Sequence, residues 1–131
     1  MTARALALRL LPGRFAVCRF EPEAPLPAWV LHEGATLWSM TRTPDELSVV
    51  CDEDSVPPSV TRVERGWCAF QVAGPIGFDE TGVLASLATP LADAGIPLFA
   101  LSTFDTDIVL VRERDLGRAT AALQEWHRVE I

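Results

Sequence analysis

The chain has 131 residues, of which 49% are hydrophobic, and a formal net charge of −7. This length fits one compact domain, or two very small units that share a core. The acidic balance argues against binding to nucleic acid or to anionic membranes, because both need clustered Lys and Arg. No apolar run approaches the roughly 20 residues of a membrane span, so we expect a cytoplasmic protein.

The three cysteines are Cys18, Cys51 and Cys68. Their number is odd, no C-x-x-C pair occurs, and only His32 and His127 could join them as metal ligands. The pattern therefore favours neither a metal site nor a disulfide framework. Apolar neighbours around each cysteine instead suggest three small buried side chains.

The first half of the chain predicts strands and little helix. The expected strands cover residues 5–10, 14–20, 37–41 and 46–51. Pro12 and Gly13 supply a turn between the first two strands, and the turn at residues 43–45 makes the last two a hairpin. Residues 28–31 are ambiguous between a helical turn and a strand, and residues 52–59 are interpreted as a connector.

The second half predicts the order strand, helix, strand, strand, helix. Its strands are expected at residues 66–72, 96–101 and 107–111. In the first helix, Asp79 is a candidate N-cap, apolar residues between 83 and 91 recur at helical spacing, and Gly95 supplies the C-terminal stop. Pro90 falls inside this pattern, and we expect it to kink or shorten the helix.

The closing helix should present Leu116, Ala119, Leu123 and Trp126 on one apolar face. All four tryptophans, at positions 29, 38, 67 and 126, are expected in the core, whereas His127 is assigned to a polar tail. Element order alone suggests that the first half is a second, degraded copy of the same unit.

Two polar segments interrupt the apolar pattern of the second half. They are Gly77–Gly82, at a strand-to-helix turn, and Ser102–Asp107, between two strands. A helix N-terminus presents backbone N–H groups that attract a carboxylate. Gly82 has no Cβ to block a close approach, although a glycine there costs about 1 kcal/mol of helix stability relative to alanine. One interpretation of the two segments is therefore a ligand site.

The acids of these segments support that interpretation without deciding it. Glu80, Asp105 and Asp107 could meet a cationic group, so amide donors and acids together match a zwitterionic or basic amino acid. The alternative is purely structural, because Asp79 could simply cap the helix while the other acids complement its dipole or occupy tight turns.

Catalysis finds less support in the sequence. Neither histidine has a Ser or Cys partner in a recognisable motif, and no G-x-x-x-x-G-K-[ST] loop or G-x-G-x-x-G fingerprint is present. The carboxylates show nothing that would drive their pKa values apart for acid–base work. We therefore expect a protein that is not an enzyme and needs no cofactor.

Four runs of the sequence resemble the tandem ACT-domain family of small bacterial proteins, which is related to the CASTOR arginine sensors of animals. They are 39-SMTRTPDELSVVCDED-54, 64-ERGWCAFQVAGP-75, 77-GFDETGVLASLATPLADAGI-96 and 102-STFDTDIVLV-111. The resemblance implies an α+β fold of two ACT-like, ferredoxin-like βαββαβ subdomains with antiparallel sheets and helices packed on one face. The subdomains would cover residues 1–60, which are atypical, and residues 61–131.

The resemblance also implies a non-enzymatic regulatory sensor that binds an amino acid, possibly a basic one, at a subdomain or dimer interface. The residues that would line this site are Gly77, Phe78, Asp79, Glu80, Thr81, Gly82, Val83, Thr103, Phe104, Asp105, Thr106 and Asp107. Asp107 would meet a cationic side chain, and a second copy of the chain would complete the site. The alternative function is a dimerisation or protein-interaction module without a ligand.

Overall fold

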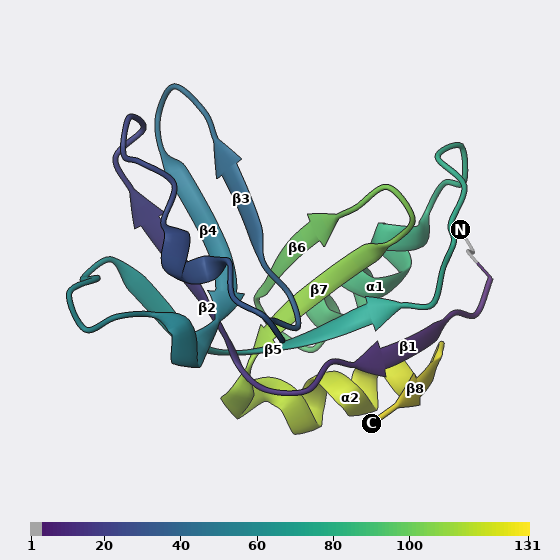
Figure 1. Ribbon diagram of the computed structural model, residues 1–131. Coiled ribbons are helices and arrows are strands. Elements are labelled where there is room, and N and C mark those ends of the chain that lie inside the picture. Colours follow the sequence, from purple (N-terminus) through teal and green to yellow (C-terminus); the bar gives the residue numbers. More distant parts are fainter. Residues whose placement is uncertain (1–3) are drawn as a thin grey trace. The chain divides into compact units, whose positions relative to one another are not determined.

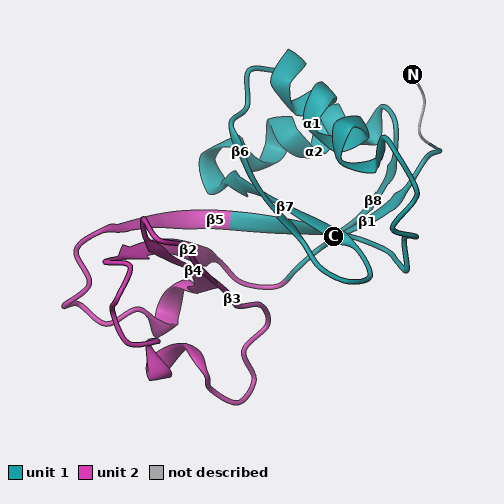
Figure 2. Ribbon diagram, turned by 90° about the horizontal axis from the view of Figure 1, so that it is seen from above, with its two compact units in different colours: residues 1–11, 68–131 teal, residues 12–67 magenta. Residues whose placement is uncertain are grey.

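A computed structural model describes residues 4–131 (Figure 1). Its strands are β1 (Ala7–Leu10), β2 (Phe15–Phe20), β3 (Ser39–Arg42), β4 (Leu47–Asp52), β5 (Val63–Val72), β6 (Leu98–Ser102), β7 (Asp107–Arg112) and β8 (Arg128–Glu130). The helices are α1 (Val83–Asp93) and α2 (Leu116–Gln124), and three short 3-10 turns lie at Ala28–Val30, Glu53–Ser55 and Glu113–Asp115. The chain forms two compact units, which are coloured separately in Figure 2.

Unit 1 comprises residues 4–11 and 68–131. Its elements from β5 onward follow the order β5, α1, β6, β7, α2, β8, which is the βαββαβ order of a ferredoxin-like fold. Both helices cover the same face of the strands of this unit (Figure 2). One strand is additional, because β1 pairs antiparallel with β5 and parallel with β8. The sheet of unit 1 is therefore mixed at this edge, whereas the sequence predicted an antiparallel sheet.

The core of unit 1 lies between that sheet and its helices. It contains Leu6, just before β1, and the buried faces of β1 (Leu8), β5 (Phe70, Val72), α1 (Val83, Leu87, Leu91), β7 (Val109, Val111) and α2 (Ala119, Leu123). Burial of these side chains fixes which face of each helix points inward, since every buried aliphatic or aromatic side chain stabilises the fold by roughly 1.5–3 kcal/mol. Val83 at the start of α1 and Val72 at the end of β5 both belong to this core.

Unit 2 comprises residues 12–67, and its strands pair in the order β3-β4-β2-β5. All three pairings are antiparallel. With the 3-10 turns at Ala28–Val30 and Glu53–Ser55 in the helix positions, the order of elements again follows βαββαβ. No α-helix forms within residues 12–67, all of which the structure describes. The α+β, ferredoxin-like class is thus confirmed, and unit 2 is its atypical member.

The compact units divide the chain differently from the subdomains expected at residues 1–60 and 61–131. Strand β1 belongs to unit 1, because its hydrogen-bond partners are β5 and β8. Strand β5 contributes residues 63–67 to unit 2 and residues 68–72 to unit 1. Whether unit 2 is a true ACT repeat stays a prediction.

Most expected elements are confirmed, including the hairpin of β3 and β4 and the stop at Gly95, whose φ is 74°. The N-cap assignment was wrong, because α1 begins at Val83 with Gly82 in the cap position, beyond Asp79. The ambiguous segment at residues 28–31 forms a 3-10 turn. All three cysteines are buried, as expected.

Pro90 was predicted to kink or shorten the helix. It does not shorten it, because α1 continues through Pro90 to Asp93, and the kink stays a prediction. A proline cannot donate to the carbonyl four residues earlier, which here belongs to Ser86. His127 replaces that donor, since its Nε2 lies 3.0 Å from the Ser86 oxygen. Its Nδ1 accepts a hydrogen bond of 3.0 Å from the backbone N–H of Leu6.

His127 is therefore buried and bound on both ring nitrogens, not part of a polar tail. Its neighbour Trp126 is 65% exposed, so the closing helix does not bury this tryptophan as predicted. Trp38 is also exposed, at 46%, whereas Trp67 is buried and Trp29 packs against the core of unit 2. The expectation of four core tryptophans was wrong for two of them.

Candidate functional site

The two polar segments singled out in the sequence face one cavity of about 360 Å³ in unit 1. Nine of the twelve expected residues line it: Gly77, Phe78, Glu80, Gly82, Val83, Thr103, Phe104, Thr106 and Asp107. The other three, Asp79, Thr81 and Asp105, do not. Sequence reasoning missed four lining residues, namely Ile76, Leu84, Ala85 and Ser102. Of these, Ser102 could have been found, because it begins the second segment.

One wall of the cavity is the start of α1. Gly82 occupies the cap position in the left-handed region, with φ of 80°, and its carbonyl accepts the N–H of Ser86 at 2.9 Å. No described side chain caps this helix. The first-turn N–H groups, including those of the lining residues Leu84 and Ala85, therefore have no intrahelical acceptor, and they carry the positive end of the helix dipole.

Gly82 has a structural reason to be glycine, independent of any ligand. A residue with a Cβ is disfavoured at a φ of 80°, at a cost of roughly 1–2 kcal/mol. Its place at the cavity and its backbone conformation both favour glycine, so the residue type alone does not distinguish the two interpretations.

The other wall is the turn between β6 and β7. The N–H of Thr103 donates to the carbonyl of Thr106 at 2.8 Å, and Thr103 Oγ1 accepts the N–H of Thr106 at 3.2 Å. Ser102 Oγ donates to Asp107 Oδ1 at 2.6 Å, which orients this carboxylate at the cavity. Hydrogen bonds within the turn thus hold the side chains of Ser102, Thr103 and Asp107 in place.

A close backbone contact holds the two walls together. The carbonyl oxygen of Asp105 accepts the N–H of Ile76 at 2.6 Å, and a Cβ added at Gly74 would lie 2.9 Å from the same oxygen. The buried hydroxyl of Thr106 donates to the carbonyl of Val72 at 2.7 Å. Asp105 therefore acts through its main chain, which explains why its side chain is absent from the cavity.

The charges at the site differ from the expectation that Glu80 would be available to a cation. Glu80 pairs with Arg4, whose Nε lies 2.9 Å from Oε2 and whose Nη2 lies 3.4 Å from Oε1. The hydrogen bond and the charge of Glu80 raise the pKa of Arg4 above its ordinary value. Asp107 is therefore the lining carboxylate better placed to receive a cation.

An aromatic pair stands at the same cavity. The rings of Phe78 and Phe104 meet edge to face, with centroids 4.8 Å apart and planes at 81°. Both side chains remain largely exposed, at 75% and 78%. Such a pair offers an apolar surface and a negative ring face for the stem or the charge of a ligand.

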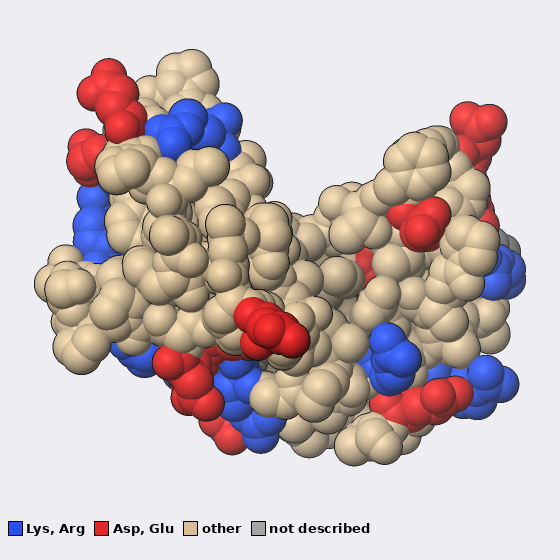
Figure 3. All heavy atoms as spheres, in the orientation of Figure 1, with Lys and Arg blue, Asp and Glu red and all other residues tan. Residues whose placement is uncertain are grey.

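Charged side chains elsewhere on the drawn face lie in small groups of both signs (Figure 3). Among residues 4–131, no group of three or more His, Cys, Asp or Glu side chains could hold a metal ion. No helix in the same range is long and apolar enough to cross a membrane.

Residues 62–125 match the family model of the ACT domain, and residues 13–59 match a second family model, which describes an N-terminal domain. The human protein CASTOR3P is 34% identical over 100 residues, which are 66% of this chain and 60% of that protein. A bovine cytosolic arginine sensor for mTORC1, subunit 1, is 34% identical over 90 residues. The chain spans only 27% of that sensor's length.

Two solved structures share the fold. Protein Atu0741 of Agobacterium tumefaciens has a TM-score of 0.88 and 41% identity, over 97% of this chain and 93% of that one. The regulatory subunit of aspartate kinase from Thermus thermophilus has a TM-score of 0.58 at 14% identity, over 95% and 97% of the two chains. The domain match, the related sensors and the βαββαβ order of unit 1 agree, and the chain belongs to the family of small ACT-domain proteins.

Proposed function

We propose that the protein is a regulatory module that binds an amino acid in the cavity between α1 and the β6–β7 turn. The observation that carries the proposal is the convergence of an uncapped helix start and an oriented carboxylate, Asp107, on one cavity. The cavity volume of about 360 Å³ is sufficient for a single amino acid. The arginine sensors among its relatives support the same class of ligand.

In this proposal each end of the ligand meets the opposite charge. The α-carboxylate accepts N–H groups of the first turn of α1, where the helix dipole favours an anion. The α-ammonium group or a basic side chain meets Asp107, and Phe78 and Phe104 contact the aliphatic stem. In this arrangement every residue that contacts the ligand belongs to unit 1, except those of whatever surface covers the open side of the cavity.

The proposal further places a second copy of the chain over the exposed aromatic pair, which would complete the enclosure. Two large apolar side chains that are three-quarters exposed are the supporting observation. Regulation then consists of a change in affinity between copies, or for another protein, when the amino acid is bound. A cytoplasmic location is proposed with it, since the related sensors are named as cytosolic.

The test is a thermal-shift screen of the twenty amino acids, followed by calorimetry on those that respond. Ligand at 100 times its Kd should stabilise the protein by about 2.7 kcal/mol. Asp107→Asn should weaken binding of a responding ligand at least tenfold. Asp79→Asn is the control, because Asp79 lies in the other polar segment, Gly77–Gly82, but does not line the cavity. No response to any amino acid from an intact oligomer would refute the proposal.

A second candidate function is an interaction module without a ligand, and the exposed Phe78–Phe104 pair favours it. If this candidate is right, Phe78→Ser should dissociate the oligomer, as measured by sedimentation. The unmodified protein should show no thermal shift with any amino acid. An amino-acid response that survives dissociation would exclude this candidate.

A further inference from the structure

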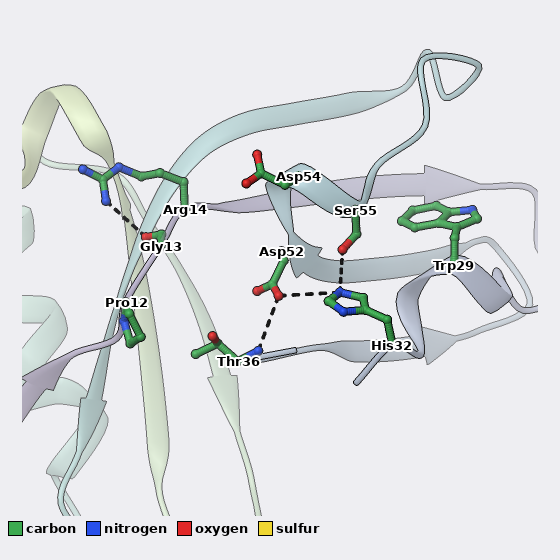
Figure 4. A pocket seen from close by; sticks show the side chains of 9 residues that line it. All are labelled: Pro12, Gly13, Arg14, Trp29, His32, Thr36, Asp52, Asp54 and Ser55. Atoms are coloured by element: carbon green, nitrogen blue, oxygen red, sulfur yellow. Dashed lines mark hydrogen bonds and ion pairs between the residues drawn. The ribbon is translucent and has the colours of Figure 1, made fainter. Parts of the chain in front are cut away.

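Unit 2 contains a cavity of its own, of about 580 Å³. Three segments line it: the turn at residues 12–14, the stretch between β2 and β3 with Trp29, His32 and Thr36, and the end of β4 with Asp52, Asp54 and Ser55 (Figure 4). None of these residues belongs to the amino-acid site proposed for unit 1. The cavity must therefore be judged by its own side chains.

A serine and a histidine meet directly in this cavity. Ser55 Oγ lies 2.6 Å from His32 Nε2. The other ring nitrogen, Nδ1, lies 3.2 Å from the carbonyl oxygen of Glu33. A carbonyl only accepts, so the contact with Glu33 suits the tautomer with its proton on Nδ1, and in that tautomer Nε2 accepts the hydroxyl of Ser55. This is the orientation that a base needs in order to take a proton from a serine.

A carboxylate stands beside the same ring nitrogen. Asp52 Oδ2 lies 3.7 Å from His32 Nε2 and accepts the N–H of Thr36 at 3.4 Å (Figure 4). Asp52 does not orient the ring as the acid of a serine protease triad does, because that task falls to the Glu33 carbonyl. Its carboxylate oxygen faces the nitrogen that would receive the proton of Ser55, so the two opposite charges would attract each other once that proton has moved.

We propose that this cavity is a reactive site in which Ser55 is a nucleophile, His32 is its general base, and the charge of Asp52 stabilises the base once it is protonated. The substrates that fit are small carboxylic esters. The indole of Trp29 gives the cavity an apolar wall for the acyl or alcohol group. The His32 side chain is 41% exposed, so a small ester can reach the pair from solvent.

The reaction balances without any further reagent than water. Ser55 Oγ forms a bond to the carbonyl carbon while its proton passes to His32 Nε2. The bond from that carbon to the alcohol oxygen then breaks, and His32 returns the proton to the leaving alkoxide. Water, deprotonated by His32, attacks the acyl-serine, and the carboxylic acid is released as Ser55 regains its proton.

The test uses the full chain and a fluorophosphonate, which forms a phosphorus–oxygen bond with an activated serine and loses HF. Few other side chains compete for the fluorophosphonate, because the chain contains no tyrosine and no lysine, its eleven Lys-plus-Arg residues all being arginines. Intact mass spectrometry and peptide mapping should find one adduct, on Ser55. Turnover of a p-nitrophenyl ester should disappear in Ser55→Ala.

His32→Gln should slow adduct formation by at least about 100-fold, the usual contribution of a general base, and Asp52→Asn should slow it less. Ser59→Ala, a nearby exposed serine, should change nothing. Ser102 is the internal reference within the unmodified protein, because its hydroxyl faces a carboxylate and no imidazole. Equal labelling of Ser55 and Ser102, or equal rates in His32→Gln, would overturn the proposal. Neither result bears on amino-acid binding in unit 1.

Discussion

Replacement of His127 by phenylalanine tests whether its two hydrogen bonds, to the backbone of Leu6 and of Ser86, stabilise unit 1. Phenylalanine leaves an aromatic ring at this position but no ring nitrogen, so the N–H of Leu6 loses its acceptor and the carbonyl of Ser86 loses its donor. Leu6 is 2% exposed and His127 is 7% exposed, so water cannot readily replace either bond. Both backbone groups would then lie buried without a partner.

A buried donor or acceptor left without a partner costs about 1–3 kcal/mol. Two such groups give an expected loss of about 3 kcal/mol, since the Ser86 bond is only partly buried. Urea unfolding followed by circular dichroism measures this loss as a lower midpoint at unchanged slope. Trp126→Phe is the control, because this neighbour is 65% exposed and should change stability by less than about 0.5 kcal/mol.

A second readout separates this explanation from a general packing defect. Amide hydrogen exchange of Leu6 should speed up more in His127→Phe than exchange in β7, whose bonds are untouched. A loss below about 0.5 kcal/mol would show that Leu6 and Ser86 find other partners, and the reasoning would fail.

Three further predictions concern unit 1 and the cysteines. Gly74→Ala should destabilise the protein by about 1–3 kcal/mol in urea unfolding, because the added Cβ would lie 2.9 Å from the backbone oxygen of Asp105. Gly77→Ala is the control and should be neutral, because a Cβ there meets no atom within 4 Å. Equal effects of the two substitutions would contradict this explanation. Thr106→Val should cost about 1–2 kcal/mol through the lost bond to Val72, and a neutral result in the same assay would show that the carbonyl is otherwise satisfied. Cys51 should resist iodoacetamide until the protein is unfolded, because the hydrogen bond with Cys18 and burial raise the pKa of its thiol, and thiolate is the reactive form. Peptide mapping that finds rapid alkylation of the native protein would refute this.

Local patterns in the sequence predicted most strands and both helices, because alternation and helical spacing follow directly from burial on one face. The cap was misplaced by a different cause. Asp79 is a good capping residue, but Gly82 adopts a left-handed conformation that only the three-dimensional path of the turn requires. Propensity alone could not choose between them.

Contacts between distant residues were beyond sequence reasoning. His127 compensates for Pro90 through Ser86, which is 41 residues away, so neither the intact helix nor the burial of His127 follows from local pattern. His32 and Ser55 are separated by 23 residues and belong to no known motif, so their contact was missed. For the candidate site, the two segments were found, but the pairing of Glu80 with Arg4 was not.

The path of the chain through unit 1 has a consequence for how this architecture can be altered. Residues 12–67 leave unit 1 after Leu11 and return at Cys68, and Leu11 donates to the carbonyl of Ala69 at 2.8 Å. Leu10 lies opposite Phe70 in the same antiparallel pair. All of unit 2 thus occupies the position of a hairpin loop, where insertions cost little. Deleting residues 12–67 and joining Leu11 to Cys68 through a tight turn should therefore leave unit 1 as a small domain of its own.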